Sequence, residues 1–292
     1  MRPAIPEAIA RVPFPVWLAL IAFITCVRCL WWQFGADDVV FVRNYTHWTS
    51  GGLQVDWSAV ASDYTGPWGG NHTARYYRPI VSTSLAIDFA LFGLVPGMTV
   101  ALNLVVHVVS SVLVWRLGLA ILPGRRAAMI AALLFVTTPL AHENIAWAVG
   151  RCGLTNVFGL AAGLSLVRAE AQSRHGLRRF LPALGFATLD LMTMESAIVW
   201  MLFPATCVAV RNGFRQHYSG LVRDFVRDAL PFGVLGLLYL GWRIVVLGSV
   251  TGEMGTGLEG SPLDIARAHE SVVGGWLGPG EGRYHSTNRA IM

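Results

Sequence analysis

Apolar runs about as long as a membrane is thick recur along the chain, and they restrict its fold more than any other feature. The hydrocarbon core of a bilayer is about 30 Å thick, and a helix crosses it with about 20 predominantly apolar residues. Seven runs approach this pattern, at residues 13–32, 98–122, 127–147, 154–167, 180–192, 196–210 and 230–247. They predict an all-α integral membrane protein with a bundle of about seven transmembrane helices.

The composition excludes a soluble globular domain. Hydrophobic residues make up 54% of the 292 residues and charged residues only 13%, which is too little polar surface to cover a soluble fold. In a soluble protein the net charge of +5 would suggest a nucleic-acid partner. In a membrane protein the placement of cations instead reports topology, so we expect membrane lipid around the chain and no nucleic acid.

The arginines predict which side of the membrane each segment faces. They concentrate in the N-terminal segment and in alternate connections, at residues 2, 11, 116, 125, 126, 168, 174, 178, 179, 211, 215, 223 and 227. Such segments usually face the cytoplasm. The N-terminus is therefore predicted to be cytoplasmic, and the long polar loop 33–97 to be the first and largest extracytoplasmic segment.

The expected organisation is a membrane module over residues 1–250, followed by a Gly-rich extracytoplasmic tail over residues 251–292. A chain stopping in such a tail is consistent with truncation, and we expect little catalysis from it alone. The four cysteines lie in or beside apolar runs, which indicates neither a disulfide framework nor a zinc site. No metal site or cofactor is predicted, and the sequence leaves open whether a divalent metal is needed.

Two adjacent carboxylates, Asp37 and Asp38, follow the first apolar run. Repulsion and partial desolvation at a membrane boundary raise the pKa of one member of such a pair, which suits a general base. The alternative is a solvated turn or a helix N-cap.

Further polar residues border the later runs. Arg78 could bind a phosphate through its guanidinium fork, or its side chain could extend to the interface without a ligand. Asn103 and His107 are one helical turn apart and share a face. Glu195 lies between two apolar runs, and an ionisable group at membrane depth is functional by default.

A polar segment at residues 139–151 contains His142, Glu143 and Arg151. His142 and Glu143 begin like the zinc motif H-E-x-x-H, but Ala146 occupies the second histidine position, so this interpretation fails. Glu143 and Arg151 could form an ion pair that shapes the turn, or could contact a substrate.

In this order the motifs resemble the membrane-embedded C-type (GT-C) glycosyltransferases, in detail the transmembrane tetratricopeptide-repeat O-mannosyltransferases and their bacterial relatives. The resemblance covers roughly residues 13–250. We expect the membrane to be a bacterial inner membrane rather than the endoplasmic reticulum. The residues that carry it are Tyr77, Arg78, Pro79, Gly93, Pro96, Asn103, His107, Glu143, Trp147, Gly150 and Arg151.

The resemblance implies a reaction and a site. In that family a carboxylate soon after the first span is the catalytic base, a position that Asp37 or Asp38 matches. The donor is a polyprenyl-phosphate sugar, and the acceptor is a glycan, protein or lipid at the extracytoplasmic face. The implied phosphate or substrate contacts are Arg78, Glu143, Arg151 and Arg243, with supporting roles for Tyr77, Asn103, His107, His142 and Glu195.

Three positions depart from the family pattern and keep other functions open. Ala141 stands where the family has His, Gly153 where it has an acidic residue, and Met194 where it has Lys. A truncated or catalytically inactive GT-C-like protein is therefore the main alternative. A transporter is the second, although no inverted repeat of the kind found in many transporters is evident.

Overall fold

The computed structural model describes residues 12–71, 75–171, 177–208 and 221–249, most of which are helical. The predicted tail at 251–292 lies outside these residues. Within the described residues, four helices are long and apolar enough to cross a membrane. They are Phe14–Trp31 (α2, Phe14–Cys26, with η1, Val27–Trp31), α6 (Pro96–Ile121), Val149–Glu170 (η3, Val149–Gly153, with α9, Leu154–Ala171) and α13 (Leu230–Leu247).

The other three predicted runs form shorter helices. The run 127–147 is divided between α7 and α8, because Pro139 cannot supply a backbone N–H to continue the first helix. The count of seven crossings therefore remains a prediction. The shorter elements are α7 (Arg125–Val136), α8 (Leu140–Ala146), η4 (Leu177–Phe180), α10 (Leu181–Leu191), η5 (Glu195–Leu202) and α12 (Leu221–Asp228).

The predicted outer loop, 33–97, is structured. It contains α3 (Ala36–Tyr45), β1 (Thr46–Thr49), β2 (Gly52–Val55), α4 (Trp57–Ser62), η2 (Trp68–Gly70) and α5 (Pro79–Phe92). The strands pair antiparallel with Thr46 opposite Val55, so a small hairpin interrupts the predicted all-α fold. The apolar helix α5, which the loop prediction missed, ends at Gly93, whose φ of +66° suits glycine.

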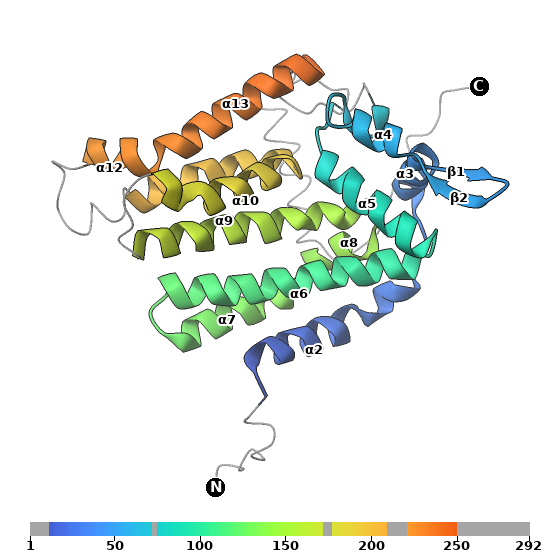
Figure 1. Ribbon diagram of the computed structural model, residues 1–292. Helices are drawn as coiled ribbons and strands as arrows, with labels where there is room; N and C mark the ends of the chain where they lie inside the picture. The colour runs from blue at the N-terminus through green and yellow to red at the C-terminus, as the bar shows by residue number, and fades with distance from the viewer. Residues whose placement is uncertain (1–11, 72–74, 172–176, 209–220, 250–292) are drawn as a thin grey trace, which may run out of the picture. The chain divides into compact units, whose positions relative to one another are not determined.

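Figure 1 shows α2, α6, α7, α9, α10 and α13 running alongside one another, with α3, α4, α5 and the hairpin gathered at one end. Helix α6 packs against α2, α7 and α9. Leu117 of α6 meets Leu160 and Leu164 of α9 in a buried apolar cluster. These contacts place α6 and α9 at the centre of the helix bundle.

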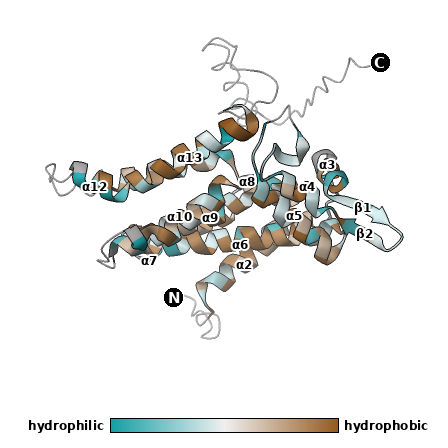
Figure 2. Cartoon of the chain, turned by 45° about the horizontal axis from the view of Figure 1, so that its top comes forward, coloured by the Kyte–Doolittle hydropathy of each residue, from teal (hydrophilic) through white to brown (hydrophobic). Residues whose placement is uncertain are grey.

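The outward faces of the helices are apolar. Figure 2 shows hydrophobic residues along α6, α9, α10 and α13, whereas the hairpin is paler and more hydrophilic. Leu134 and Leu237 are each 69% exposed and Val245 is 77% exposed. In water such exposure would be costly, but in a bilayer these side chains contact lipid.

Candidate functional site

Asp38 has both carboxylate oxygens engaged by backbone N–H groups. One accepts from Gly35 and the other from Val149, each at 2.9 Å, and the side chain is buried. The first bond satisfies a free N–H at the start of α3 and the second ties α3 to η3. Of the two adjacent carboxylates, Asp38 is therefore the one that caps α3. Asp37 lies in the first turn of α3, and its side chain is outside the described residues.

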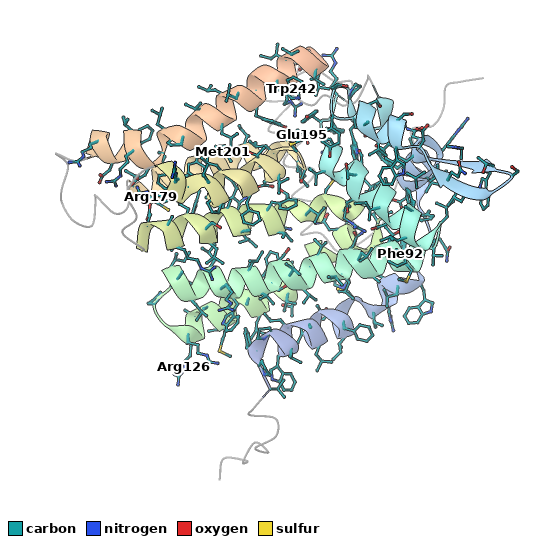
Figure 3. All side chains as sticks on the ribbon, viewed as in Figure 1. Phe92, Arg126, Arg179, Glu195, Met201 and Trp242 are labelled. Carbon is teal, nitrogen blue, oxygen red and sulfur yellow. The ribbon has the colours of Figure 1, made fainter. Side chains whose placement is uncertain are left out.

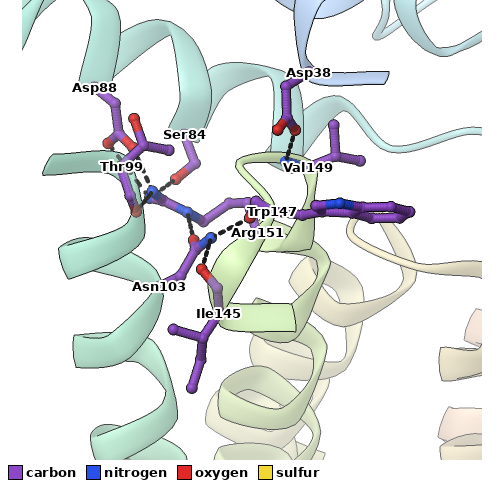
Figure 4. A network of polar contacts seen from close by, with 9 residues as sticks. All are labelled: Asp38, Ser84, Asp88, Thr99, Asn103, Ile145, Trp147, Val149 and Arg151. Carbon is purple, nitrogen blue, oxygen red and sulfur yellow. Dashed lines mark hydrogen bonds and ion pairs between the residues drawn. The ribbon is translucent and has the colours of Figure 1, made fainter. Parts of the chain in front are cut away.

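Arg151 forms a buried network with residues of α5 and α6 (Figure 4). Its guanidinium pairs with Asp88 and donates to the hydroxyl of Ser84 at 2.9 Å, the amide oxygen of Asn103 at 2.7 Å and the carbonyl of Thr99 at 3.3 Å. The hypothesis of a Glu143–Arg151 ion pair is wrong. Asp88 is the partner because α5 packs against η3, whereas Glu143 lies on the exposed side of α8.

Asn103 holds the turn that follows α8. Its amide nitrogen donates to the carbonyl of Trp147 at 2.5 Å and to that of Ile145 at 3.3 Å, while its oxygen accepts from Arg151. The turn is so close-packed that a Cβ on Gly150 would lie 2.1 Å from the backbone oxygen of Asn144. The Gly150-Arg151 sequence is thus explained by packing in this turn.

His107 and His142 both bond to main-chain carbonyls. His107 is buried, with Nε2 3.1 Å from the carbonyl oxygen of Val136 at the end of α7. The exposed His142 lies with Nε2 3.0 Å from the carbonyl oxygen of Thr25 and so links α8 to α2. Asn103 and His107 do lie on one side of α6, but they contact different segments.

A second polar group joins the loop before α5 to η5 and α13. We call it the Arg78 cluster, formed by Arg78, Glu195 and Arg243. Arg78 donates to one oxygen of Glu195 from Nε at 3.1 Å and from Nη2 at 2.9 Å. Nη1 of Arg243 lies 3.5 Å from the other oxygen, which also accepts the backbone N–H of Tyr77 at 2.9 Å. Two guanidinium groups facing one carboxylate give the cluster a formal charge of +1.

Aromatic rings flank Arg78. Its Cζ lies 4.8 Å from the ring centroid of Trp68 and 4.3 Å from that of Tyr76, which is cation–π geometry. The Arg78 and Glu195 side chains remain 13% and 20% exposed, whereas Arg243 is 1% exposed and its Nε has no hydrogen-bond partner among the described residues. The cluster is thus partly open on the Arg78 side. Tyr76 directly precedes the Tyr77-Arg78-Pro79 motif, whereas Trp68 was not named from sequence, although its position in the aromatic-rich loop was a signal for it.

The Arg78 cluster and the Arg151 network meet at η3. Nη1 of Arg78 lies 3.5 Å from Sγ of Cys152, the residue after Arg151. The structure therefore brings Asp38, Arg78 and Arg151 together at one short segment, and Glu195 joins them through Arg78 and Arg243 through Glu195. Glu143 and His142 are not part of this group.

Another buried carboxylate, that of Asp63, links the end of α4 to α3 and α5. It accepts hydrogen bonds from the hydroxyls of Tyr45 and Ser82, and from the N–H of Gly69 at 3.1 and 3.2 Å to its two oxygens. Burial raises the pKa of Asp63 and also that of the Tyr45 phenol. Sequence reasoning did not single out Asp63, because its burial depends on contacts with a segment about twenty residues away.

The residues that the structure describes give no support for a metal site. Within residues 12–71, 75–171, 177–208 and 221–249, no group of three or more His, Cys, Asp and Glu side chains is arranged to hold a metal ion.

Together these features define an α-helical membrane protein with a charged polar site at one end of its helices. Over part of its length the chain is similar to protein O-mannosyl-transferases. It is 30% identical to TMTC1 of Mus musculus over 164 residues, 34% identical to TMTC3 of Mus musculus over 111 residues, and 29% identical to Tmtc1 of Drosophila melanogaster over 174 residues.

These relatives are much longer than the matched region. The matches cover 54%, 37% and 56% of this chain, but only 17%, 12% and 20% of the respective relatives. No protein-family model matches the chain, and no solved structure matches it. The similarity confirms the resemblance inferred from the motifs.

Proposed function

We propose that the protein is a membrane glycosyltransferase that transfers a sugar from a polyprenyl-phosphate donor to an acceptor hydroxyl at the outer face of the membrane. The observation that carries this proposal is the convergence on η3 of the Asp37–Asp38 turn and the Arg78 cluster. Similarity to protein O-mannosyl-transferases supports the reaction class.

In the proposed reaction Asp37 is the general base. Asp38 is occupied by two backbone N–H groups, so its neighbour is the better candidate for taking a proton. The base removes the proton of the acceptor hydroxyl as that oxygen attacks the anomeric carbon. The bond from the anomeric carbon to the phosphate oxygen breaks with inversion, and the polyprenyl phosphate leaves with the electron pair.

The Arg78 cluster is proposed to bind the phosphate of the donor. Its excess positive charge suits an anion, and arginine forks bind phosphate well. Negative charge grows on the leaving phosphate during the reaction, so a fixed guanidinium stabilises the transition state more than the bound donor. We assign Arg151 a positioning role instead, because its side chain is only 4% exposed and Asp88 balances its charge. Arg78 is 13% exposed and shares one carboxylate with Arg243.

The test separates binding from chemistry. Binding is followed in nanodiscs by quenching of tryptophan fluorescence with polyprenyl phosphate, and free polyprenol serves as the control for the lipid chain. Arg78→Gln is expected to weaken binding of the phosphate but not of the alcohol. If the wild-type protein bound polyprenyl phosphate and polyprenol with equal affinity, the phosphate site would be refuted.

Chemistry is tested with a panel of polyprenyl-phosphate sugars. In whichever form of the protein is active, Asp37→Asn is expected to lower turnover by about 10²- to 10⁴-fold with little effect on stability, as for loss of a general base. Asp38→Asn should mainly lower the unfolding temperature, because it weakens the cap. Wild-type turnover in Asp37→Asn would show that the base assignment is wrong. Donor binding without any transfer would favour the catalytically inactive alternative.

A further inference from the structure

A cavity of about 350 Å³ lies among α6, α7, α8, η3 and α9, and the proposed reaction does not use it. None of the residues lining it is charged. Its polar lining consists of Asn103, His107, Ser110, Thr138, Asn144 and Asn156. A polar, uncharged cavity between helices of a membrane protein is unusual, because hydrocarbon cannot satisfy hydrogen-bonding groups.

The break between α7 and α8 creates part of this lining. Helix α7 ends at Val136, and Thr138 and Pro139 precede α8. The Val136 carbonyl can only accept, so Nε2 of His107, 3.1 Å away, carries a proton and donates to it. Interrupted membrane helices are tolerated where the broken backbone lines a cavity.

Three side chains at the cavity make no hydrogen bond within the described part of the chain: Thr138, Asn144 and Asn156. Each asparagine amide offers two donors and an acceptor, and the threonine hydroxyl can both donate and accept a hydrogen bond. Leaving such groups unpaired in an apolar surrounding is costly. The lining therefore fits a ligand that itself carries both donors and acceptors.

We propose that this cavity binds the uncharged head of a neutral membrane lipid, with its hydroxyl and ester oxygens against Thr138, Asn144 and Asn156. The lack of any cation in the lining disfavours a phosphate head group. Leu134 is 69% exposed at the cavity, and Asn144 is also exposed, so a lipid can enter from the bilayer. A water molecule occupies about 30 Å³ in the liquid. The cavity, at about 350 Å³, is therefore large enough for a group of the size of glycerol. The proposal does not depend on the proposed glycosyl transfer.

Photolabelling of the full 292-residue chain in nanodiscs tests the proposal. The probe is a diacylglycerol with a diazirine beside one ester, and the comparison is phosphatidic acid with the same acyl chains. The diacylglycerol is expected to label the peptide spanning residues 138–156 at least severalfold more strongly than phosphatidic acid does. Thr138→Val combined with Asn156→Leu should remove most of that labelling.

The adjacent Thr137 provides a matched control. Its hydroxyl donates to the carbonyl of Leu133 at 2.8 Å, and it does not line the cavity. Thr137→Val should therefore leave labelling unchanged. The Asn156→Leu chain should be at least as thermally stable as the wild type in lipid without diacylglycerol, because it removes an unpaired polar group.

Three results would overturn the proposal. The first is equal labelling of the wild type and the double variant. The second is equal labelling by diacylglycerol and phosphatidic acid, which would deny any preference for a neutral head. The third is background labelling of the wild type, which would mean that protein covers the cavity.

Discussion

At the scale of single residues, η3 is the junction of the site. Val149 donates its N–H to Asp38, Arg151 pairs with Asp88, and the thiol of Cys152 contacts Arg78. Side chains from α3 and from the start and the interior of α5 thus meet on four consecutive residues. A change in η3 is therefore expected to disturb the whole site.

Gly150 offers a direct test of that packing. An alanine Cβ there would lie 2.1 Å from the backbone oxygen of Asn144, and backbone cannot move away as a flexible side chain does. We expect Gly150→Ala to destabilise the protein by about 1–3 kcal/mol or more, measured by thermal unfolding in detergent. Gly185→Ala is the control, because its Cβ would meet nothing within 4 Å. Equal stability of the two variants would contradict the close contact.

The Asp88–Arg151 pair supplies a second prediction. Asp88→Leu leaves a buried guanidinium without its counter-charge, which typically costs about 3–5 kcal/mol. Replacing both partners, as Asp88→Leu with Arg151→Met, should recover much of this loss. The measurement is the unfolding free energy, and Arg126→Met at an exposed position is the control. If the double variant is less stable than the single one, the charges are not acting as a pair.

At the scale of elements, α3, α4 and α5 are held together by buried hydrogen bonds as well as apolar contacts. Tyr45 of α3 and Ser82 of α5 both donate to Asp63 at the end of α4. The aromatic rings of Phe41 and Trp68 stack beside them, with centroids 4.4 Å apart. The outer segment is therefore a packed unit whose stability depends on one carboxyl group.

This carboxyl group makes the outer segment sensitive to pH. Burial raises the pKa of Asp63 in the folded state, so the folded segment binds a proton more tightly than the unfolded chain does. The resulting stabilisation is fully present below the unfolded pKa of about 3.9 and is lost as the pH rises through the folded value. As the pH rises through the folded pKa of Asp63, the rate of hydrogen exchange at the Gly69 amide should therefore increase by more than its intrinsic pH dependence.

Asp63→Asn should abolish this additional pH dependence. Asp56 gives the opposite sign, because its hydrogen bonds with Ser58 lower its pKa. Its stabilisation is present above about pH 3.9 and is lost as the pH falls through the folded value. Unchanged pH dependence in Asp63→Asn would show that another group is responsible.

At the scale of the whole molecule, charged residues divide between the two ends of the helices. Figure 3 shows Arg126 and Arg179 at one end, and Phe92 and Glu195 towards the other. Arg179 forms an ion pair with Asp228, the last residue of α12, at 2.5 Å. Which end faces the cytoplasm stays a prediction from the distribution of arginine.

The topology can be tested with reporters. A reporter fused after Arg125 should read as cytoplasmic, and one inserted near Gly66 should read as external, because arginine-rich connections stay on the cytoplasmic side. Compartment-specific activity of the reporter is the measurement. A cytoplasmic signal at Gly66 would put the proposed site on the wrong face for the proposed donor and overturn the orientation.

The long apolar helices could be located from sequence because membrane solubility is a local property of the chain. The predicted runs 98–122 and 230–247 lie within two residues of α6 (Pro96–Ile121) and α13 (Leu230–Leu247). The hairpin was missed because its strands are only four residues long. Helix α5 was missed because Ser82, Thr83, Ser84 and Asp88 interrupt its apolar sequence. The division of 127–147 shows that apolar composition does not reveal where a helix stops inside the run.

For the site, the sequence determined the candidate residues, and the tertiary structure decided their partners. Arg78, Glu195 and Arg243 were each identified from sequence, but Arg78 and Glu195 are 117 positions apart. They meet because the start of α5 lies against the segment around the start of η5. Likewise, Glu143 was the predicted partner of Arg151 because it is close in sequence, yet Arg151 pairs with Asp88. An ion pair in an apolar interior forms between the charges that burial brings together, and burial is set by the helices that pack rather than by proximity along the chain.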